Sequence, residues 1–592
     1  MRLTPRRRAW RDLALLAGLC LPLYFWGLTT HGVTNWQEAQ RLVVAREMQA
    51  RGEWLVPTLG GRPYLAKPPL VYWCQLGLAK ATGGPVDLWH LRLTVALAGL
   101  LGVLATYGAA RVLVPGPGAA PLWSALLTAT GFLYVRSSRI GELDILLAPT
   151  VVAAVAGVAL AWRRWRETRS VAYGWLALGA LAGSLAALAK GPPALLVIGL
   201  AAYGGIALHA AFTPAEHREH RAPSGTRAGV VMALIGFLAV AAAAALNLGI
   251  KPDLGGYAGV ALLALAGAAL ADVLFRLTDR ERARRLWCSL AGTHPLAVLG
   301  VPALVLWGWY RAVESRVGAG AAGLVSEESE NLALFHPGAP LANLEGLAYG
   351  AGLGSVLGLA ALVMLARRRV APVRPEWFIL VAWVALGVTG FSVLGKGVPR
   401  YLTPLWPALS MLGGLLLGTL IGAARDRSGQ RRLSAALGFV IFGLAAGQAW
   451  WYGHAREHAP GSRGRSPGAL VAALRAQGFG PDRLATLEFR TPAVDYYAGR
   501  TVPAVGDVRM REAMAGQTPL ELDEFAGLVR RSGGPWAVLV RAERGRSVAA
   551  GAPAERLRAA GLAVRELSEP VPEFVIDRGR TRVLPVIVRA AP

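Results

Sequence analysis

Residues 31–75 read HGVTNWQEAQRLVVAREMQARGEWLVPTLGGRPYLAKPPLVYWCQ and follow the first apolar segment long enough to cross a membrane. A loop that only joins two spans can be short, whereas this one carries charged and aromatic residues, among them Arg41, Tyr64 and Lys67. Functional residues collect on loops that a rigid scaffold positions, and ionisable residues beside a bilayer are costly unless they are used. The stretch therefore indicates chemistry at a membrane face.

The composition is that of a polytopic membrane protein. The 592 residues are 54% hydrophobic and only 17% charged, whereas a soluble chain has about a quarter charged residues. The apolar residues fall in runs of about 17–23, the length that crosses ~30 Å of hydrocarbon. We expect thirteen spans, near residues 12–29, 90–113, 119–135, 143–161, 171–188, 192–212, 228–247, 256–275, 295–310, 346–366, 377–394, 401–423 and 434–451.

The formal net charge of +26 follows membrane topology and does not indicate nucleic-acid binding. Basic loops follow every second expected span, near 163–166, 218–227, 276–285, 367–369 and 425–432. The positive-inside rule then puts the N-terminus in the cytoplasm, and the odd number of spans puts the C-terminus outside. The Arg-, Ala- and Gly-rich composition favours a bacterial chain, so we expect a multi-pass protein of the inner membrane.

Residues 455–592 differ from the apolar domain of residues 1–454. Short apolar runs at 483–489, 536–541, 573–577 and 583–588 alternate with helix-like segments at 466–477, 520–531 and 552–560. This alternation predicts a small α/β domain on the outer face. A basic linker rich in Gly, Pro and Ser at 459–468 precedes it, and we expect the domain to cap or shape a substrate site.

The first loop offers one candidate carboxylate. Residues 35–50 are predicted to form an amphipathic helix on the membrane surface, with Gln37, Glu38 and Arg41 mainly on its polar side. Asn35 is a favourable N-cap, and Glu38 three residues later would complete a capping box. Glu38 facing a lipid-side cavity as a general base is the other interpretation, and the two are compatible.

A second carboxylate, Asp144, lies where the third expected span meets the fourth, in RIGELD (139–144). An unpaired charge at a span entry is expensive. Asp144 is therefore either paired with Arg136 or Arg139, or it is a catalytic or acceptor-orienting carboxylate. We expect the neighbouring Glu142 to be solvated.

Four cations lie at span ends on the outer side: Lys67 in LAKPP, Lys190 in LAKGPPA, and Lys396 and Arg400 in GKGVPRY. The prolines after Lys67 favour an extended backbone and lead into apolar sequence, so this side chain should stay near the membrane face. Any one cation could be a topology anchor that snorkels to the interface. Together they oppose the positive-inside bias, which favours a site for an anionic headgroup.

Other residues are weaker candidates. Glu330 and Asn331 add an acidic patch to the same face, unless they belong to a solvated loop. The three cysteines form neither a disulfide framework nor a metal-ligand spacing, and His336 has no partner suggested by the sequence. We therefore expect no metal and no other cofactor.

Five segments, in this order, resemble the GT-C glycosyltransferases that use polyprenyl-phosphate sugars, particularly the aminoarabinose transferases and protein O-mannosyltransferases. They are AREMQARGEWLVPTLGGRPYLAKPPLVYW (45–73), SRIGELD (138–144), LAKGPPALL (188–196), ENLALF (330–335) and GKGVPRYLTPLWPAL (395–409). The resemblance covers residues 1 to about 450. It implies an all-α membrane domain of about thirteen helices, an active site in the first extracytoplasmic loop (31–89) and a lipid-linked donor. In that family an acidic residue of the first loop acts as base, and the Lys of KPP with later cations holds the lipid phosphate.

The chain departs from the family pattern at the base. The family usually has Asp-Glu where this chain has Gln37-Glu38, and a Gln side chain cannot take a proton at neutral pH. Gln40 stands where Arg is usual, with Arg41 one step later. Ala66 precedes Lys67 where the aminoarabinose group often has Glu.

The leading hypothesis is an enzyme that moves a sugar from a polyprenyl phosphate to a lipid, glycan or protein acceptor. Glu38 or Asp144 would be the base, and Lys67, Lys190, Lys396 and Arg400 would hold the departing phosphate. The residues that would position the substrates are Gln37, Arg41, Tyr64, Arg139, Glu330 and Tyr401.

Two alternatives remain open. A catalytically degenerate relative would bind a lipid-linked sugar without turnover, because Gln37 replaces the usual acid. A transporter or flippase of lipid-linked sugars would place ionisable residues near the midplane and show repeated halves, whereas these charges gather at span ends.

Overall fold

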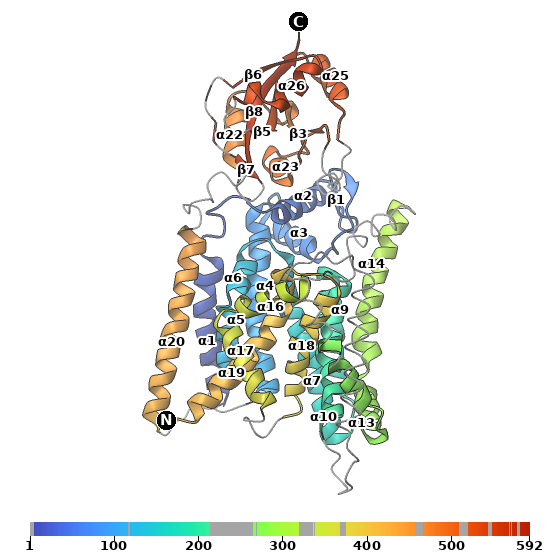
Figure 1. The fold of residues 1–592 in the computed structure, drawn as a ribbon, viewed down its shortest axis with the longest axis vertical. Coiled ribbons are helices and arrows are strands. Elements are labelled where there is room, and N and C mark those ends of the chain that lie inside the picture. The colour runs from blue at the N-terminus through green and yellow to red at the C-terminus, as the bar shows by residue number, and fades with distance from the viewer. Residues whose placement is uncertain are drawn as a thin grey trace.

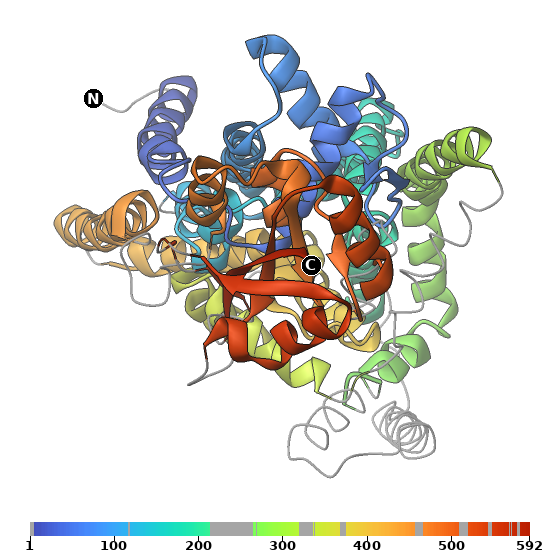
Figure 2. The same cartoon turned by 90° about the horizontal axis from the view of Figure 1, so that it is seen from above.

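The computed structural model describes residues 5–115, 119–213, 265–318, 336–367, 374–455, 466–507, 519–542 and 547–591, apart from 268, 337, 425, 568, 570, 573 and 577–580. In this part of the chain a bundle of apolar helices carries a smaller domain of helices and strands at one end (Figure 1). The N-terminus lies at the opposite end of the bundle. The smaller domain covers the centre of the bundle when the molecule is seen from above (Figure 2).

The bundle confirms the expected fold class, a mostly helical membrane domain. Seven described helical stretches are long and apolar enough to cross a membrane, or eight if α16 and α17, bent by 111°, form one broken span. The expected spans coincide with described helices, except those near 228–247 and 256–275, which lie wholly or partly outside the described residues. The helices are α1 (Pro5–Phe25), α4 (Leu88–Leu113), α5 (Ala120–Ala129), α6 (Phe132–Arg139), η1 (Leu143–Leu146), α7 (Leu147–Thr168), α8 (Tyr173–Lys190), α9 (Pro192–Ile198), η2 (Gly199–Tyr203), α10 (Gly204–Phe212), α13 (Arg280–Thr293), η3 (Leu296–Gly300), α14 (Val301–Val317), α16 (Ala339–Gly350), α17 (Leu353–Ala366), α18 (Trp377–Val393), η4 (Pro399–Leu405), α19 (Trp406–Gly422), α20 (Arg427–Trp450) and η5 (Trp451–Ala455).

Glycines let helix α19, most of which is buried, pack closely against α5 and α17. A Cβ atom at Gly414 of α19 would lie 2.2 Å from Oγ of Ser124 in α5. One at Gly358 of α17 would lie 2.3 Å from the carbonyl oxygen of Leu409 in α19. Small residues at such contacts are how helices pack within a membrane, where water does not drive them together.

The first loop folds into α2 (Trp36–Ala50), a short hairpin of β1 (Thr58–Leu59) and β2 (Arg62–Pro63), and α3 (Leu70–Thr82). The predicted helix and its N-cap are confirmed, because the Asn35 side chain accepts a hydrogen bond from the Gln37 N–H at 3.0 Å. The predicted burial pattern is wrong in part: Glu38 and Arg41 are buried, not on an exposed polar side. Helix α2 packs against α3 and α4 and is also covered by α23 of the C-terminal domain, so it does not simply lie on a membrane surface (Figure 1).

The C-terminal domain is an α/β fold, as expected. Its sheet has the order β4-β3-β5-β8-β6, and β7 also pairs with β8. Strands β4, β3 and β5 are parallel, whereas β8 runs antiparallel to its partners. The elements are α22 (Gly468–Ala476), η6 (Pro481–Arg483), β3 (Leu484–Leu487), α23 (Pro492–Ala498), β4 (Ala504–Val505), α25 (Leu522–Ser532), β5 (Trp536–Arg541), η7 (Val548–Ala550), α26 (Ala552–Ala559), β6 (Leu562–Glu566), β7 (Phe574–Ile576) and β8 (Thr581–Ala590).

Candidate functional site

Segments far apart in the sequence meet at the end of the bundle that faces the first loop. The end of α8 and the short helix η4 both contact η1, which precedes α7. The KPP segment joins them, since a Cβ atom at Gly191 would lie 3.8 Å from Cγ of Pro68. Helix α2 brings Arg41 to the same place, where it interacts electrostatically with Arg400.

Asp144 is at the centre of this site. Its carboxylate is 3% exposed and forms an ion pair with the ammonium of Lys190. Arg400 Nε lies 3.9 Å from the other carboxylate oxygen. Lys190 is the last residue of α8, where the helix dipole favours a cation, and Gly191 ends that helix with φ +80°. Of the two alternatives for Asp144, its pairing with Arg136 or Arg139 is therefore wrong.

Tyr401 lies between two of the cations. The centre of its ring is 4.0 Å from Lys190 Nζ and 5.3 Å from Arg400 Cζ. Attraction between a cation and an aromatic face holds such a pair without neutralising either charge. Tyr401 can thus hold the ammonium of Lys190 and the guanidinium of Arg400 in place, and both groups keep the positive charge that would attract an anion.

Arg41 and Lys67 complete what we call the cation cluster (Arg41, Lys67, Lys190 and Arg400). Lys190 is close enough to each of the other three cations to be repelled by it electrostatically. Lys67 is half-buried, and its ammonium donates a hydrogen bond of 2.8 Å to the carbonyl of Ala66. Arg41 is 4% exposed, and burial lowers the pKa of its guanidinium.

Two polar groups of α2 beside the cluster are poorly satisfied. Arg41 donates through Nη1 to the carbonyl of Gln37, but among the described residues its buried Nε has no hydrogen-bond acceptor. The buried side-chain oxygen of Gln37 likewise has no donor in the part of the chain that the structure describes. Buried polar groups in proteins are nearly always hydrogen-bonded. The Nε of Arg41 and the side-chain oxygen of Gln37 are therefore suited to bind a polar ligand. Tyr64 and Tyr72 are close enough to Arg41 to interact with it electrostatically.

Positive charge is in excess at the site. Among the described residues, Asp144 forms ion pairs with the cluster, and Glu142 is close enough to attract Arg41 and Lys190 electrostatically. Glu142 is neutralised by Arg136 at 2.9 Å and accepts a hydrogen bond from Ser137. It is fully buried, so the expectation of a solvated Glu142 is wrong. Since an uncompensated buried charge costs several kcal/mol, the cluster is suited to bind an anion.

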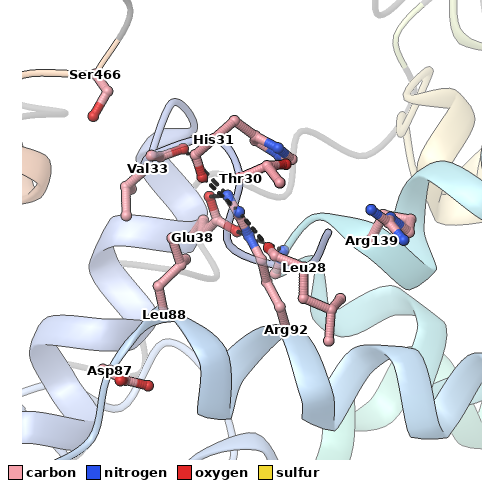
Figure 3. Close-up of polar contacts among 12 residues, drawn as sticks. Leu28, Thr30, His31, Val33, Glu38, Asp87, Leu88, Arg92, Arg139 and Ser466 are labelled. Atoms are coloured by element: carbon pink, nitrogen blue, oxygen red, sulfur yellow. Dashed lines mark hydrogen bonds and ion pairs between the residues drawn. The ribbon is translucent and has the colours of Figure 1, made fainter. Parts of the chain in front are cut away.

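Glu38, the other candidate base, is held by Arg92 of α4 (Figure 3). It accepts hydrogen bonds from Arg92 and also from the Gly141 N–H at 3.1 Å. The carboxylate therefore stabilises the tertiary structure, and the predicted capping box is wrong. The sequence analysis did not predict a role for Arg92, although an arginine within an apolar span indicates a buried partner.

Of three other predicted residues, Arg139 and Lys396 make the contacts given below, and Glu330 lies outside the described residues. Arg139 donates to the carbonyls of Leu23, Trp26 and Gly27, so it caps the end of α1 instead of facing a substrate. Lys396 is half-buried in the turn after α18, four residues before Arg400, and its N–H donates to the carbonyl of Phe391. Asn331, next to Glu330, also lies outside the described residues. In the described part of the chain no three His, Cys, Asp or Glu side chains are grouped so that they could hold a metal ion.

Comparisons with known proteins agree with this architecture. Residues 7–216 match the family model described as dolichyl-phosphate-mannose-protein mannosyltransferase. An uncharacterised protein of Aquifex aeolicus is 31% identical over 172 residues, which are 29% of this chain and 33% of that relative. The match thus spans about a third of the curated relative's length.

Two solved structures share the fold over most of the chain. ArnT from Cupriavidus metallidurans, bound to undecaprenyl phosphate, superposes with a TM-score of 0.63 and 17% identity over 98% of both chains. The oligosaccharyltransferase AglB from Archaeoglobus fulgidus, in complex with an inhibitory peptide and a dolichol-phosphate, gives 0.50 and 12% over 91% of this chain and 70% of that one. The resemblance noted in the sequence is confirmed, and this chain is a multi-pass membrane protein with the GT-C glycosyltransferase fold.

Proposed function

We propose that this protein transfers a sugar, a hexose or a pentose, from a polyprenyl phosphate to a lipid, glycan or protein acceptor. The reaction would take place on the extracytoplasmic side of a bacterial inner membrane. The observation that carries the proposal is the excess of positive charge, on buried and half-buried side chains, around Asp144 at the end of the bundle that faces the first loop. Oligosaccharyltransferase and ArnT structures that contain lipid phosphates support a donor of that class.

The cations would bind the phosphate of the donor. During transfer the bond from the anomeric carbon to the phosphate oxygen breaks, and the phosphate leaves with the electron pair. Lys67, Lys190 and Arg400 would stabilise the charge that develops on it, with Lys396 close to Arg400 in the chain. A glycosyl phosphate already carries a good leaving group, so the reaction would need neither a nucleotide nor an obligatory metal.

Asp144 is the better candidate for the base. The acceptor hydroxyl attacks the anomeric carbon and must give up its proton to a group near the phosphate. Asp144 already contacts two of the cations that would hold that phosphate, whereas both oxygens of Glu38 are engaged by Arg92. A bound phosphate would replace Asp144 as the counter-ion of Lys190 and free the carboxylate to take the proton.

Gln37, Arg41, Tyr64 and Tyr401 would orient the substrates. The unpaired oxygen of Gln37 and the unpaired Nε of Arg41 offer an acceptor and a donor one turn apart on α2. Hydroxyl groups of a sugar can use both. Arg139 is not part of this proposal because it binds the end of α1.

A protein that binds a lipid-linked sugar without turnover is the second candidate. Two observations favour it: Gln37 cannot act as a base, and Glu38 is occupied by Arg92. It differs from the enzyme in one measurable respect, since it would retain the donor and release no sugar.

The test is sugar transfer by the full chain in membrane vesicles supplied with labelled polyprenyl-phosphate sugars. Lys67→Ala and Lys190→Met should each lower kcat/KM by about a hundredfold, because each removes a charge that stabilises the leaving phosphate. Lys80→Ala, which removes an exposed cation at the end of α3, is the matched control and should leave transfer unchanged. Full activity in both cluster variants would contradict the proposal, and donor binding without transfer in the wild type would favour the second candidate.

A further inference from the structure

The C-terminal domain contacts the first loop through two adjacent tyrosines of α23, Tyr496 and Tyr497. Arg46 of α2 lies over the Tyr496 ring, with 4.0 Å between Cζ and the ring centre. The same guanidinium donates to the carbonyl of Tyr496 at 2.9 Å and to the carbonyl of Val86 at 2.7 Å. The Tyr496 hydroxyl accepts the N–H of Leu88, the first residue of α4, at 3.1 Å. Tyr496 therefore ties α2 to the start of α4.

Tyr497 holds the other end of the same stretch. Its hydroxyl oxygen accepts the N–H of Val33 at 2.8 Å and the hydroxyl of Ser466 at 3.1 Å. The chain packs tightly here, since a Cβ atom at Gly32 would lie 2.6 Å from the Tyr497 hydroxyl. Val33 lies near the start of the first loop and Leu88 near its end, so the two tyrosines fix the entry and the exit of this loop.

These contacts bear on the site because α2 is one rigid element. Arg41 and Gln37, which lie beside the cations, are on the same 15-residue helix as Arg46. A continuous helix transmits a shift at one residue to the others, because each turn is hydrogen-bonded to the next. The position of Arg41 relative to Lys190 thus depends on where α23 holds Arg46.

We propose that Tyr496 and Tyr497, with Arg46, are positioning residues through which the C-terminal domain sets the place of α2 in the donor-phosphate site. We call these three residues the tyrosine clasp. The inference rests on the proposed function for its readout. It adds that the C-terminal domain acts on the donor site through α2, not only as a cover.

The first measurement is hydrogen exchange of the full chain in nanodiscs. Tyr496→Ala removes the ring under Arg46 and the acceptor for Leu88, and should speed exchange of the α2 amides about tenfold. Tyr496→Phe keeps the ring and should give a smaller effect, as should Tyr497→Phe, which removes the acceptor for Val33. Trp536→Phe is the control: it removes a hydrogen bond to Ser532 within the C-terminal domain and should leave α2 unchanged.

The second measurement is binding of undecaprenyl phosphate to the same variants. In Tyr496→Ala the displacement of Arg41 should raise the Kd for undecaprenyl phosphate about tenfold, and the KM for the donor should rise by the same factor. A merely structural defect would lower the number of binding sites and leave the Kd of the remaining sites unchanged.

The outcomes separate the two proposals. Unchanged α2 exchange in Tyr496→Ala, or faster exchange with an unchanged Kd and donor KM, overturns the clasp alone. If the wild type binds no undecaprenyl phosphate, the proposed function fails and the clasp inference fails with it.

Discussion

Arg92 donates to both carboxylate oxygens of Glu38, at 2.8 and 3.0 Å, and neither side chain is exposed. Its remaining N–H groups bind the carbonyls of Leu28, His31 and Gly32 (Figure 3). All five guanidinium N–H groups therefore have acceptors. The pair joins α4, α2 and the chain between α1 and α2, so it holds the first loop onto the bundle.

Arg92→Leu should lower the free energy of unfolding by about 3–5 kcal/mol, because it leaves Glu38 buried without a counter-ion. The measurement is unfolding of the full chain in mixed micelles with increasing SDS. Arg500→Leu is the control, since Arg500 pairs with Asp482 at the surface and exposed pairs contribute about 0–1 kcal/mol. Equal stability of the two variants would contradict a structural role for Arg92.

The two candidate bases can be separated by their variants. Asp144→Asn should lower kcat by a factor of about 10² to 10⁴, because the acceptor hydroxyl loses its base. Glu38→Gln should lower the yield of folded protein through its contact with Arg92, but kcat per folded molecule should stay within about threefold. The measurement is single-turnover sugar transfer, normalised to binding-competent protein. The opposite order of effects would return the catalytic role to Glu38.

The parts of the fold that local sequence determines were predictable. Asn35 marked the start of α2, and strands β3 and β5 fall within the predicted apolar runs at 483–489 and 536–541. The order of KPP, LAKGPP and GKGVPRY along the chain also indicated that Lys190 and Arg400 belong to one site, and both contact Asp144.

What could not be predicted depends on contacts between distant residues. Glu38 fits a local capping pattern, but its carboxylate binds the buried Arg92, 54 positions away, instead of the backbone N–H at the start of α2. Asp144 pairs with Lys190, which lies 46 residues further on, and not with the nearby Arg139. Tyr496 meets Arg46 across 450 residues, and a short helix such as α23 leaves no periodic pattern to detect.

Tyr401 offers a test of how the cations are held. Tyr401→Phe keeps an aromatic face beside Lys190 and Arg400, so the Kd for undecaprenyl phosphate should change by less than about threefold. Tyr401→Leu removes the aromatic ring and should raise the Kd by roughly tenfold. Calorimetric titration of the full chain in nanodiscs measures both. A large loss in the Phe variant would mean that the hydroxyl, not the ring, contacts the ligand.

The C-terminal domain should show a pH dependence that comes from Asp495, the neighbour of Tyr496. Burial raises the pKa of its carboxyl from 3.8 to about 6, although Arg490 at 3.4 Å and the Val502 N–H lower it. Glu47 of α2 raises it further. Because the folded-state pKa lies above the unfolded value, the folded domain binds this proton more tightly. The contribution of Asp495 to stability is thus complete below about pH 4 and lost as the pH rises through about 6.

Hydrogen exchange of α23, corrected for the intrinsic rate, should therefore show less protection at pH 7 than at pH 5. Asp495→Asn should remove this difference, since an amide does not titrate, even if it lowers protection at both pH values by leaving Arg490 without its counter-charge. Asp523→Asn changes an exposed carboxylate of the same domain and should keep the wild-type difference. If the Asp495→Asn variant kept the full wild-type difference, the proton responsible would have to lie on another group.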